Sequence, residues 1–226
     1  RIEHGGDGDD GDDNNDGLGG CPVKISGSFE IDRTHPDTLI FLGEFAIDFG
    51  DGSGCPDSTR VKKGSMTDTF NFTFGFKPRL HLISSSQTIA FDEFSGGRKG
   101  IDGTFVVKTE EPGMKSIEIQ SVVITYPDTT SASFDGSFES VDHDFGTLNR
   151  GDDTRTLTGN LTGTSRDGAE FSAEITTEVL FKFACFKRRD IPVSGIVDIT
   201  TDGTSSTVDF GDGRCDKGVV RGRQIG

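Results

Sequence analysis

Tryptophan is absent from this chain of 226 residues, and tyrosine occurs only once, as Tyr126. Sugar-binding platforms are built mainly from the flat, amphipathic rings of these two residues, so a sugar-stacking face is poorly supplied. The aromatic residues that are present are 19 phenylalanines, scattered among Thr, Ser, Val and Ile. This composition favours the pleated, half-buried surface of a β-sheet over a helical stripe.

Long apolar runs and positive charge are also scarce. No apolar run reaches about 18 residues, the length at which a membrane-spanning helix is expected, so we expect no transmembrane span. The 23 Lys and Arg residues face 38 Asp and Glu residues, which gives a net charge of −15. Such an acidic chain repels nucleic acid and anionic lipid headgroups at long range, and neither is an expected partner.

Signatures of catalysis and of zinc binding are missing as well. The chain has no G-x-S-x-G, no H-E-x-x-H and no C-x-x-C, and its four histidines stand far apart, at His4, His35, His81 and His143. Carboxylates are numerous enough to supply a glycosidase pair. Many of them stand beside glycine in turn signals, however, which argues against the buried setting that raises the pKa of a catalytic acid. We therefore predict that the chain is not an enzyme.

Short segments of alternating apolar and polar residues run through the chain from Cys21 onward. Ile117–Ile124 and Phe171–Ile175 are two examples with period two, which is typical of half-buried strands. Between such segments stand dipeptides that supply the positive φ of tight hairpin turns: Asp51-Gly52, Gly96-Gly97, Asp102-Gly103, Pro112-Gly113, Asp135-Gly136, Asp167-Gly168 and Asp202-Gly203. The pattern predicts an all-β fold, a meander of antiparallel strands packed as one large β-sandwich or two small ones.

Composition divides the chain into a lead and a folded body. Residues 1–20 contain seven acidic residues, seven glycines and a single arginine, a composition typical of a disordered acidic segment. We expect residues 1–20 to be a calcium-binding lead, residues 21–112 a first β module and residues 113–226 a second. The two modules are either separate or joined in one continuous β domain.

An internal repeat stands near each end of the body. Each copy has a Cys, a strand containing Ser-Gly, the segment Asp-Phe-Gly-Asp-Gly and a closing Cys: Cys21, Ser26-Gly27, Asp48–Gly52 and Cys55, then Cys185, Ser194-Gly195, Asp209–Gly213 and Cys215. The repeat predicts two related hairpins. Of the three pairings that four cysteines allow, it selects the disulfides Cys21–Cys55 and Cys185–Cys215, each worth about 3 to 4 kcal/mol in the loop-entropy model.

The repeated Asp-Phe-Gly-Asp-Gly segment has two interpretations. Its first three residues match the magnesium-binding triplet of protein kinases, but the other kinase motifs are missing. The segment is either a turn, in which glycine permits the bend and aspartate bonds the turn's own amides, or a set of calcium ligands. We favour the turn.

The lead offers the stronger candidate for a metal site. Asp12–Gly17 fits the first half of the calcium-loop pattern D-x-[DN]-x-[DN]-G, although the twelfth position is Val23 and not the usual Glu. Calcium is favoured over magnesium because clustered carboxylates and carbonyls can supply the seven or so oxygens that calcium accepts. A solvated acidic tail is the alternative. The predicted ligands are Asp12, Asn14 and Asp16, completed by Asp7, Asp9 or Asp10.

Several segments resemble a group of Bacteroidetes cell-envelope lipoproteins of uncharacterised function: Ile124–Asp128, Leu157–Gly168, Cys185–Asp216 and Asp48–Asp57. The resemblance implies an exported protein, extracellular or on the outer-membrane surface, with an all-β fold and no catalytic residues to transfer. Residues 66–110 depart from the sequence pattern of that group. The chain starts at Arg1 and not at methionine, so we expect a signal segment and a lipid anchor upstream. Residues 7–22 are also similar to the acidic calcium loops of thrombospondin type 3 repeats.

The same resemblance implies glycosylation. Bacteria of that group O-glycosylate triplets of Asp, Ser or Thr, and a small or aliphatic residue, and the chain carries three such triplets. The predicted glycan sites are Thr38, Ser58 and Thr129. Chance occurrence of so short a pattern is the alternative.

The function that these observations favour is a non-catalytic extracellular or cell-surface structural or adhesive β protein, stabilised by calcium. One form of it is a self-assembling filament subunit. Its partners are expected to be copies of itself or other envelope proteins that add a strand to an exposed sheet edge. The alternative is a carbohydrate- or ligand-binding surface lipoprotein.

Overall fold

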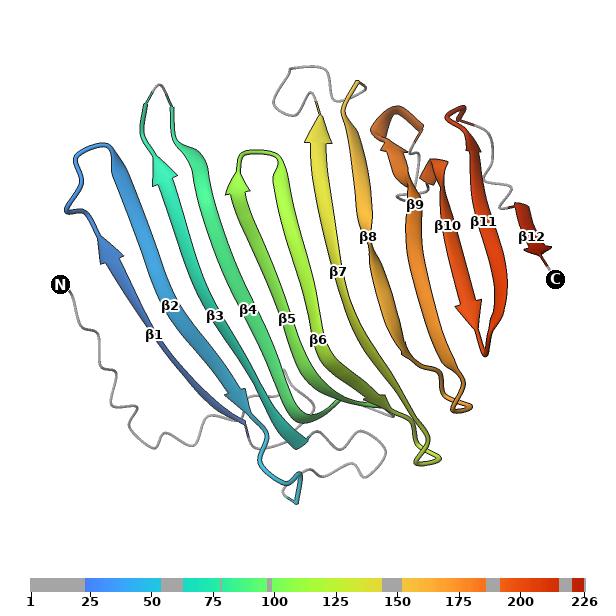
Figure 1. The fold of residues 1–226 in the computed structure, drawn as a ribbon. Coiled ribbons are helices and arrows are strands. Elements are labelled where there is room, and N and C mark those ends of the chain that lie inside the picture. The colour runs from blue at the N-terminus through green and yellow to red at the C-terminus, as the bar shows by residue number, and fades with distance from the viewer. Residues whose placement is uncertain are drawn as a thin grey trace. The chain divides into compact units, whose positions relative to one another are not determined.

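The computed structural model describes residues 23–53, 63–77, 79–96, 99–143, 152–185, 192–215 and 221–225. These residues are almost entirely β-strand, with one short 3-10 turn, η3, at Phe183–Cys185 (Figure 1). The all-β prediction is confirmed. Within the described ranges no helix has the length and apolar character needed to cross a lipid bilayer.

The described strands form one antiparallel open sheet, in which they lie side by side in chain order from β1 to β12 (Figure 1). The predicted meander is confirmed, but the predicted β-sandwich is wrong for the described residues. A sandwich requires consecutive strands to change sheet, whereas short connections keep them hydrogen-bonded neighbours. Short connections of this kind lie at residues 33–37, 112–113, 126–130, 165–169 and 202–203.

The chain divides into two compact units, which we describe separately. Unit 1 comprises Arg1–Lys108 and Gln120–Ser131, and unit 2 comprises Thr109–Ile119 and Ala132–Gly226. Unit 1 contains β1 (Lys24–Asp32), β2 (Thr38–Asp48), β3 (Lys63–Gly75) and β4 (His81–Gly96), with most of β5 (Lys99–Glu111) and the end of β6 (Met114–Thr125). Unit 2 contains the end of β5, the first half of β6 and nearly all of β7 (Ser131–His143). It also contains β8 (Thr154–Thr164), β9 (Glu170–Lys182), β10 (Pro192–Thr201), β11 (Thr204–Asp212) and β12 (Arg221–Ile225).

The sheet of unit 1 has one apolar and one polar face. Side chains alternate between faces along a strand, and the antiparallel registers align the apolar positions of neighbouring strands. The opposite positions are mainly Thr, Ser and charged residues, with Ile40, Leu42 and Ala46 of β2 among them. The apolar face carries Ile25, Phe29, Ile31, Leu39, Phe41, Phe45, Ile47, Met66, Phe70, Phe72, Phe74, Leu82, Ile89 and Phe91.

Unit 2 repeats this division into an apolar and a polar face. Phe134 of β7 and Phe171 of β9 meet edge to face, with ring centroids 6.0 Å apart. Gly163 of β8 is the register partner of both phenylalanines, and its missing side chain leaves room for the two rings to meet. Few apolar side chains of the described residues are buried. The apolar side chains below a tenth exposed, among those described, are Phe49, Val122, Ala132, Val179 and Val193.

The turn predictions are partly confirmed. Asp51-Gly52, Pro112-Gly113, Asp167-Gly168 and Asp202-Gly203 lie in turns, whereas Asp102-Gly103 and Asp135-Gly136 lie inside β5 and β7. Gly103 has a φ of +116°, and a Cβ there would stand 2.6 Å from the Cα of Val122. This glycine therefore allows the main chains of β5 and β6 to approach closely within the sheet. It does not form a turn.

The two copies of the internal repeat form two hairpins, as predicted. The first pairs β1 with β2, and the second pairs β10 with β11. The registers differ, because Ser26 faces Ala46 in the first hairpin and the equivalent Ser194 faces Asp212 in the second. The two copies share their strands and closing turn but not the length of the hairpin loop, which is 33–37 in one and 202–203 in the other.

Candidate interaction surface

The Asp-Phe-Gly-Asp-Gly segments make the same aspartate-to-amide hydrogen bonds in both copies. Asp48 and Asp209 each accept a hydrogen bond from the amide two residues ahead, at 2.7 Å from Gly50 and 2.9 Å from Gly211. Asp51 and Asp212 do the same for the amides of Ser53 and Arg214, at 2.8 and 3.3 Å. The four glycines Gly50, Gly52, Gly211 and Gly213 all have positive φ. The interpretation as a structural turn is confirmed for the first segment, whereas in the second segment Asp209–Asp212 belong to strand β11 and only Gly213 lies beyond its end.

The second predicted disulfide is also confirmed. Cys185, at the end of η3, is bonded to Cys215, which closes the second hairpin copy. The partners of the first predicted disulfide, Cys21 and Cys55, lie outside the described residues, so that pairing stays a prediction.

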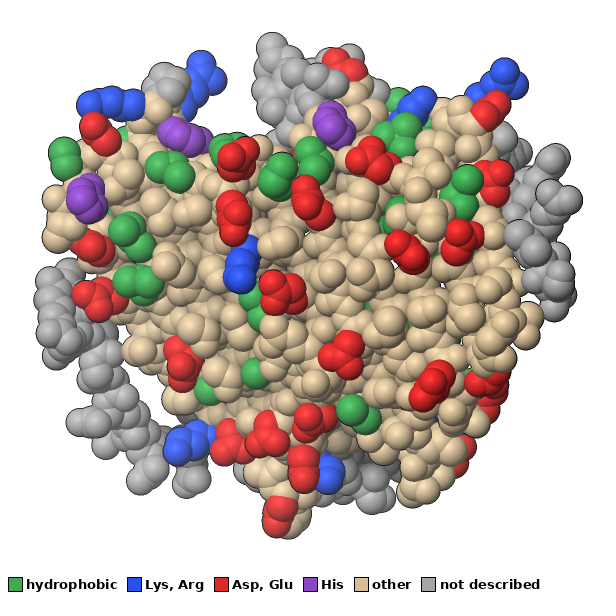
Figure 2. All heavy atoms as spheres, viewed as in Figure 1, with side chains coloured by type: hydrophobic (Ala, Val, Ile, Leu, Met, Phe, Trp, Pro, Cys, Tyr) green, Lys and Arg blue, Asp and Glu red, His purple; other side chains and the backbone are tan. Residues whose placement is uncertain are grey.

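The predicted calcium ligands Asp7, Asp9, Asp10, Asp12, Asn14 and Asp16 all lie outside the described residues. Among the residues that are described, no three or more His, Cys, Asp or Glu side chains come together to hold a metal ion. Carboxylates are instead spread over the strands of the face that Figure 2 shows. The calcium site in the lead stays a prediction.

The three predicted glycan sites have different surroundings. Thr38 begins β2 and is half-buried, whereas Thr129 is exposed in the turn between β6 and β7 with a φ of +67°. Asp128, the first residue of that triplet, accepts a hydrogen bond from the hydroxyl of Thr130 at 2.6 Å. Ser58 lies outside the described residues. The structure holds no glycan, so all three stay predictions.

An ion pair that the sequence did not indicate joins β7 to β8. Asp142 accepts hydrogen bonds from Nε and Nη2 of Arg155 at 2.5 and 3.2 Å. The Asp142 side chain is only 5% exposed and that of Arg155 is 33% exposed. The guanidinium also lies over the ring of Phe183, 5.6 Å from its centroid. Because both carboxylate oxygens are bonded, the arrangement suits an anchor between strands better than a reactive site.

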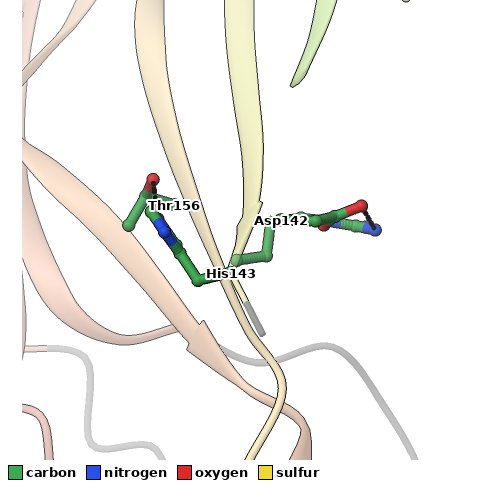
Figure 3. Close-up of polar contacts among 4 residues, drawn as sticks. Asp142, His143 and Thr156 are labelled. Carbon is green, nitrogen blue, oxygen red and sulfur yellow. Dashed lines mark hydrogen bonds and ion pairs between the residues drawn. The ribbon is translucent and has the colours of Figure 1, made fainter. Parts of the chain in front are cut away.

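The neighbouring residue His143 points to the other side of β7 (Figure 3). Its Nε2 lies 3.2 Å from the hydroxyl of Thr156, the next residue after Arg155. Consecutive residues of β7 therefore contact consecutive residues of β8 on opposite faces. The register places Asp142 directly opposite Arg155 and His143 opposite Thr154, so Thr156 is the diagonal neighbour of His143 on the same face of the sheet.

The apolar face of unit 1 is held together by phenylalanine pairs. Phe41 and Phe74 meet edge to face at 5.8 Å between centroids, and Phe70 and Phe72 lie 5.6 Å apart. A Cβ added to Gly43 would stand 2.4 Å from Cζ of Phe70, so the Phe70 ring covers that glycine. Contacts between the rings thus run across β2 and β3.

One carboxylate interrupts this apolar face. The register places Asp68 of β3 between Phe45 of β2 and Ile89 of β4. The side-chain amide of Gln87 donates to one oxygen of Asp68 at 2.9 Å, and the other oxygen is buried without a partner among the described residues. The sequence could have identified this interruption, because Asp68 stands at a position of β3 where the period-two pattern predicts an apolar side chain.

The apolar face of unit 1 ends at the edge strand β1. Among the described strands, β1 has a neighbour on one side only, β2. Residues Lys24–Glu30 are all exposed, including Ile25 at 51% and Phe29 at 60%. Phe45 on β2 is also 38% exposed. The edge of the sheet therefore presents apolar side chains together with main-chain groups that another strand could pair.

Sequence reasoning expected association through an edge strand without identifying the strand. A signal was present in the segment after Cys21, which alternates Ile25, Gly27 and Phe29 with Lys24, Ser26, Ser28 and Glu30. Its position at the sheet edge follows only from the order of the strands. No known protein family, curated protein or solved structure matches this chain.

Proposed function

We propose that this chain is a non-catalytic structural or adhesive protein of the cell exterior or the outer-membrane surface. It associates with copies of itself, or with other envelope proteins, by adding strands to its sheet. The observation that carries the proposal is β1, an edge strand with seven consecutive exposed residues. A strand of another molecule can hydrogen-bond to such an edge and cover its apolar side chains.

The disulfide Cys185–Cys215 supports a location outside the cytoplasm, because disulfides persist mainly in oxidising compartments. The second disulfide, Cys21–Cys55, and glycans at Thr38, Ser58 and Thr129 belong to the same proposal. Calcium bound by the lead would stabilise a protein whose net charge is −15, since a bound cation offsets repulsion among carboxylates.

A structural role agrees with the way in which the described carboxylates are used. Asp48, Asp51, Asp209 and Asp212 each accept a hydrogen bond from the main-chain amide two residues ahead, and Asp142 is paired with Arg155. These contacts hold the main chain and neighbouring strands in place. Carboxylates engaged in this way favour a scaffold over an acid and base pair poised for catalysis.

Electron micrographs of the purified protein, over a range of concentrations and with calcium or a chelator, test this proposal. We expect self-association that increases with concentration, because a strand added at β1 joins the sheet of one molecule to the sheet of another. Single particles of monomer size under every condition would contradict the self-association in this proposal. Binding of those single particles to a glycan array would then favour the alternative, a carbohydrate-binding surface protein.

A further inference from the structure

The residues of β1 and its flank read as a self-complementary sequence about Gly27. We propose that β1 pairs in antiparallel orientation with β1 of a second copy, with Gly27 facing Gly27 across a two-fold axis. This inference rests on the proposed function, because it assigns the strand and register through which the protein would associate with itself. The residues concerned are 23–31, of which 24–31 lie in β1.

Charge complementarity selects this partner. In the register centred on Gly27, Lys24 of each copy faces Glu30 of the other, which gives two pairs of opposite charge. Opposite charges directly across an antiparallel pair stabilise it, and like charges destabilise it. Lys24 and Glu30 are both exposed. Charges on an edge strand commonly prevent association, but here the same charges match when two copies meet.

The apolar residues match in the same register. Ile25 of one copy faces Phe29 of the other, and both side chains are more than half exposed in the single chain. Within the sheet, Ile25 faces Ile47 and Phe29 faces Gly43, which the Phe70 ring covers. The pairing therefore joins the apolar faces of two copies into one continuous surface and reduces the contact of Ile25 and Phe29 with water.

The remaining positions agree as well, because Ser26 faces Ser28 and Val23 faces Ile31. A register centred on Ser28, in which the partner of each residue moves by two positions, would still place Lys24 opposite Asp32. It would, however, place Glu30 opposite Ser26 and Phe29 opposite Gly27, so that one charge and one aromatic ring lose their matched partners. The sequence of β1 therefore favours the register centred on Gly27.

Charge reversal tests the pairing by sedimentation velocity. Lys24→Glu and Glu30→Lys should each weaken self-association by about tenfold or more, because each creates two pairs of like charge. An equal mixture of the two variants, and the double variant Lys24→Glu/Glu30→Lys, should both restore association to within about threefold of the original chain. Lys99→Glu, which makes the same charge change on β5, should have little effect. Unchanged circular dichroism and melting temperature confirm that each variant is folded.

Disulfide crosslinking tests the register. A mixture of Ser26→Cys and Ser28→Cys proteins should form a disulfide dimer on mild oxidation, because positions 26 and 28 face each other across the two-fold axis and Cβ atoms in directly opposed pairs are about 4.5–5.5 Å apart. Either variant alone should crosslink weakly, since its like positions are diagonal neighbours about 7–8 Å apart. Efficient crosslinking of Ser28→Cys alone would show the shifted register and overturn this one.

Different results would contradict the proposed function and the β1 pairing. An original chain that stays monomeric at every concentration, up to about 1 mM, would overturn both the self-association and this register. A chain that assembles, but whose association is unaffected by Lys24→Glu and Glu30→Lys, would leave the proposed function in place and overturn the β1 pairing. Restoration in the mixture together with the mixed disulfide would establish it.

Discussion

Single aspartates stabilise turns at many points of this chain. Asp32, Asp51 and Asp167 each stand two residues from a Ser or Thr in a turn and bond to it. The hydroxyl of Ser165 donates a hydrogen bond of 2.5 Å to the carboxylate of Asp167. This bond holds the pKa of that carboxyl below its ordinary value. In Asp51 the bonds from Ser53 lower the pKa in the same way.

The pH dependence of the Asp167 turn follows from the direction of this shift. Because the pKa in the folded chain lies below the ordinary value of about 3.9, the bond stabilises the fold above that pH. Its contribution is lost as the pH falls through the folded pKa. We expect Ser165→Ala to raise the pKa of Asp167 toward the ordinary value, measured by carbon NMR titration of the carboxyl group.

A matched control for that titration is Ser137→Ala, which removes a hydroxyl from an exposed position on β7. The Asp167 titration should be the same in this variant as in the original chain. An identical midpoint for Asp167 with and without the Ser165 hydroxyl would show that the hydroxyl does not lower this pKa.

Two glycines with positive φ should differ sharply in their response to alanine. Gly159 in β8 has a φ of +136°, and a Cβ there would stand 2.2 Å from the carbonyl oxygen of Ser137. Gly168, in the turn between β8 and β9, has a φ of +88° and nothing within 4 Å of such a Cβ. Gly168→Ala should cost about 1 to 2 kcal/mol from the main-chain conformation alone. Gly159→Ala should cost about 3 kcal/mol or more, because strand β7 must also move.

Urea unfolding of the two alanine variants measures this difference. Equal losses of stability in Gly159→Ala and Gly168→Ala would contradict the close approach of β7 and β8. The comparison is informative because both sites carry the same change of residue and both have positive φ.

At the scale of strands, two ion pairs provide a contrast in burial. Asp142 and Arg155 link β7 to β8 with side chains 5% and 33% exposed, whereas Asp37 and Lys77 form a pair at 2.6 Å with side chains 57% and 78% exposed. Loss of one partner of a buried pair leaves the other charge uncompensated. Exposed pairs are screened by water and salt.

Alanine substitution should therefore affect the two pairs differently. Asp142→Ala should reduce the free energy of unfolding by about 2 to 3 kcal/mol, a value lowered from that of a fully buried pair because Arg155 is partly in contact with water. Asp37→Ala should cost about 1 kcal/mol or less. Thermal unfolding of both variants at low and high salt checks the prediction, and a larger loss in Asp37→Ala would contradict it.

The strands were largely predictable from sequence, but the packing of their apolar faces was not. Alternation in Ile117–Ile124 and Phe171–Ile175 correctly predicted two-faced strands. That pattern reports that one face is apolar but not what covers it, which is why a sandwich was expected and a single sheet was found. Asp102-Gly103 was wrongly predicted as a turn. A glycine in a strand can allow two main chains to come close together, as well as allowing the chain to reverse direction in a turn.

The contacts between strands were the least predictable part. Asp142 and Arg155 meet only because β7 and β8 pair in one particular register, and the alternation within each strand does not specify which residues face each other. The turn bonds of Asp48 and Asp209 were predictable because they are local. Disulfide Cys185–Cys215 was predictable because it closes a repeated hairpin.

For the whole molecule, we expect calcium to stabilise the chain through the acidic lead. Seven acidic residues lie between Glu3 and Asp16, and their repulsion is only partly screened at about 0.15 M salt. A cation that binds only the ordered form stabilises it by mass action. Calcium should therefore raise the melting temperature and protect residues 7–20 from proteolysis, and a chelator should reverse both effects.

Substitutions separate this site from the turns. Asp12→Ala and Asp16→Ala should each reduce the calcium-dependent rise in melting temperature. Asp48→Ala should leave that rise unchanged, because the Asp48 carboxylate bonds the amide of Gly50 within a turn. Equal protease sensitivity of the lead with calcium and with chelator would show that residues 1–20 are a solvated acidic tether.

The central claim is that the molecule extends its sheet through the edge strand β1. Hydrogen exchange, read by mass spectrometry at low and high protein concentration, tests it most directly. Amides of Lys24–Asp32 should exchange more slowly at the higher concentration, because pairing with another strand protects the outward-facing groups of an edge. Peptides from β8, which already has β7 and β9 as neighbours, should be unchanged. Equal exchange in β1 at every concentration would contradict the claim.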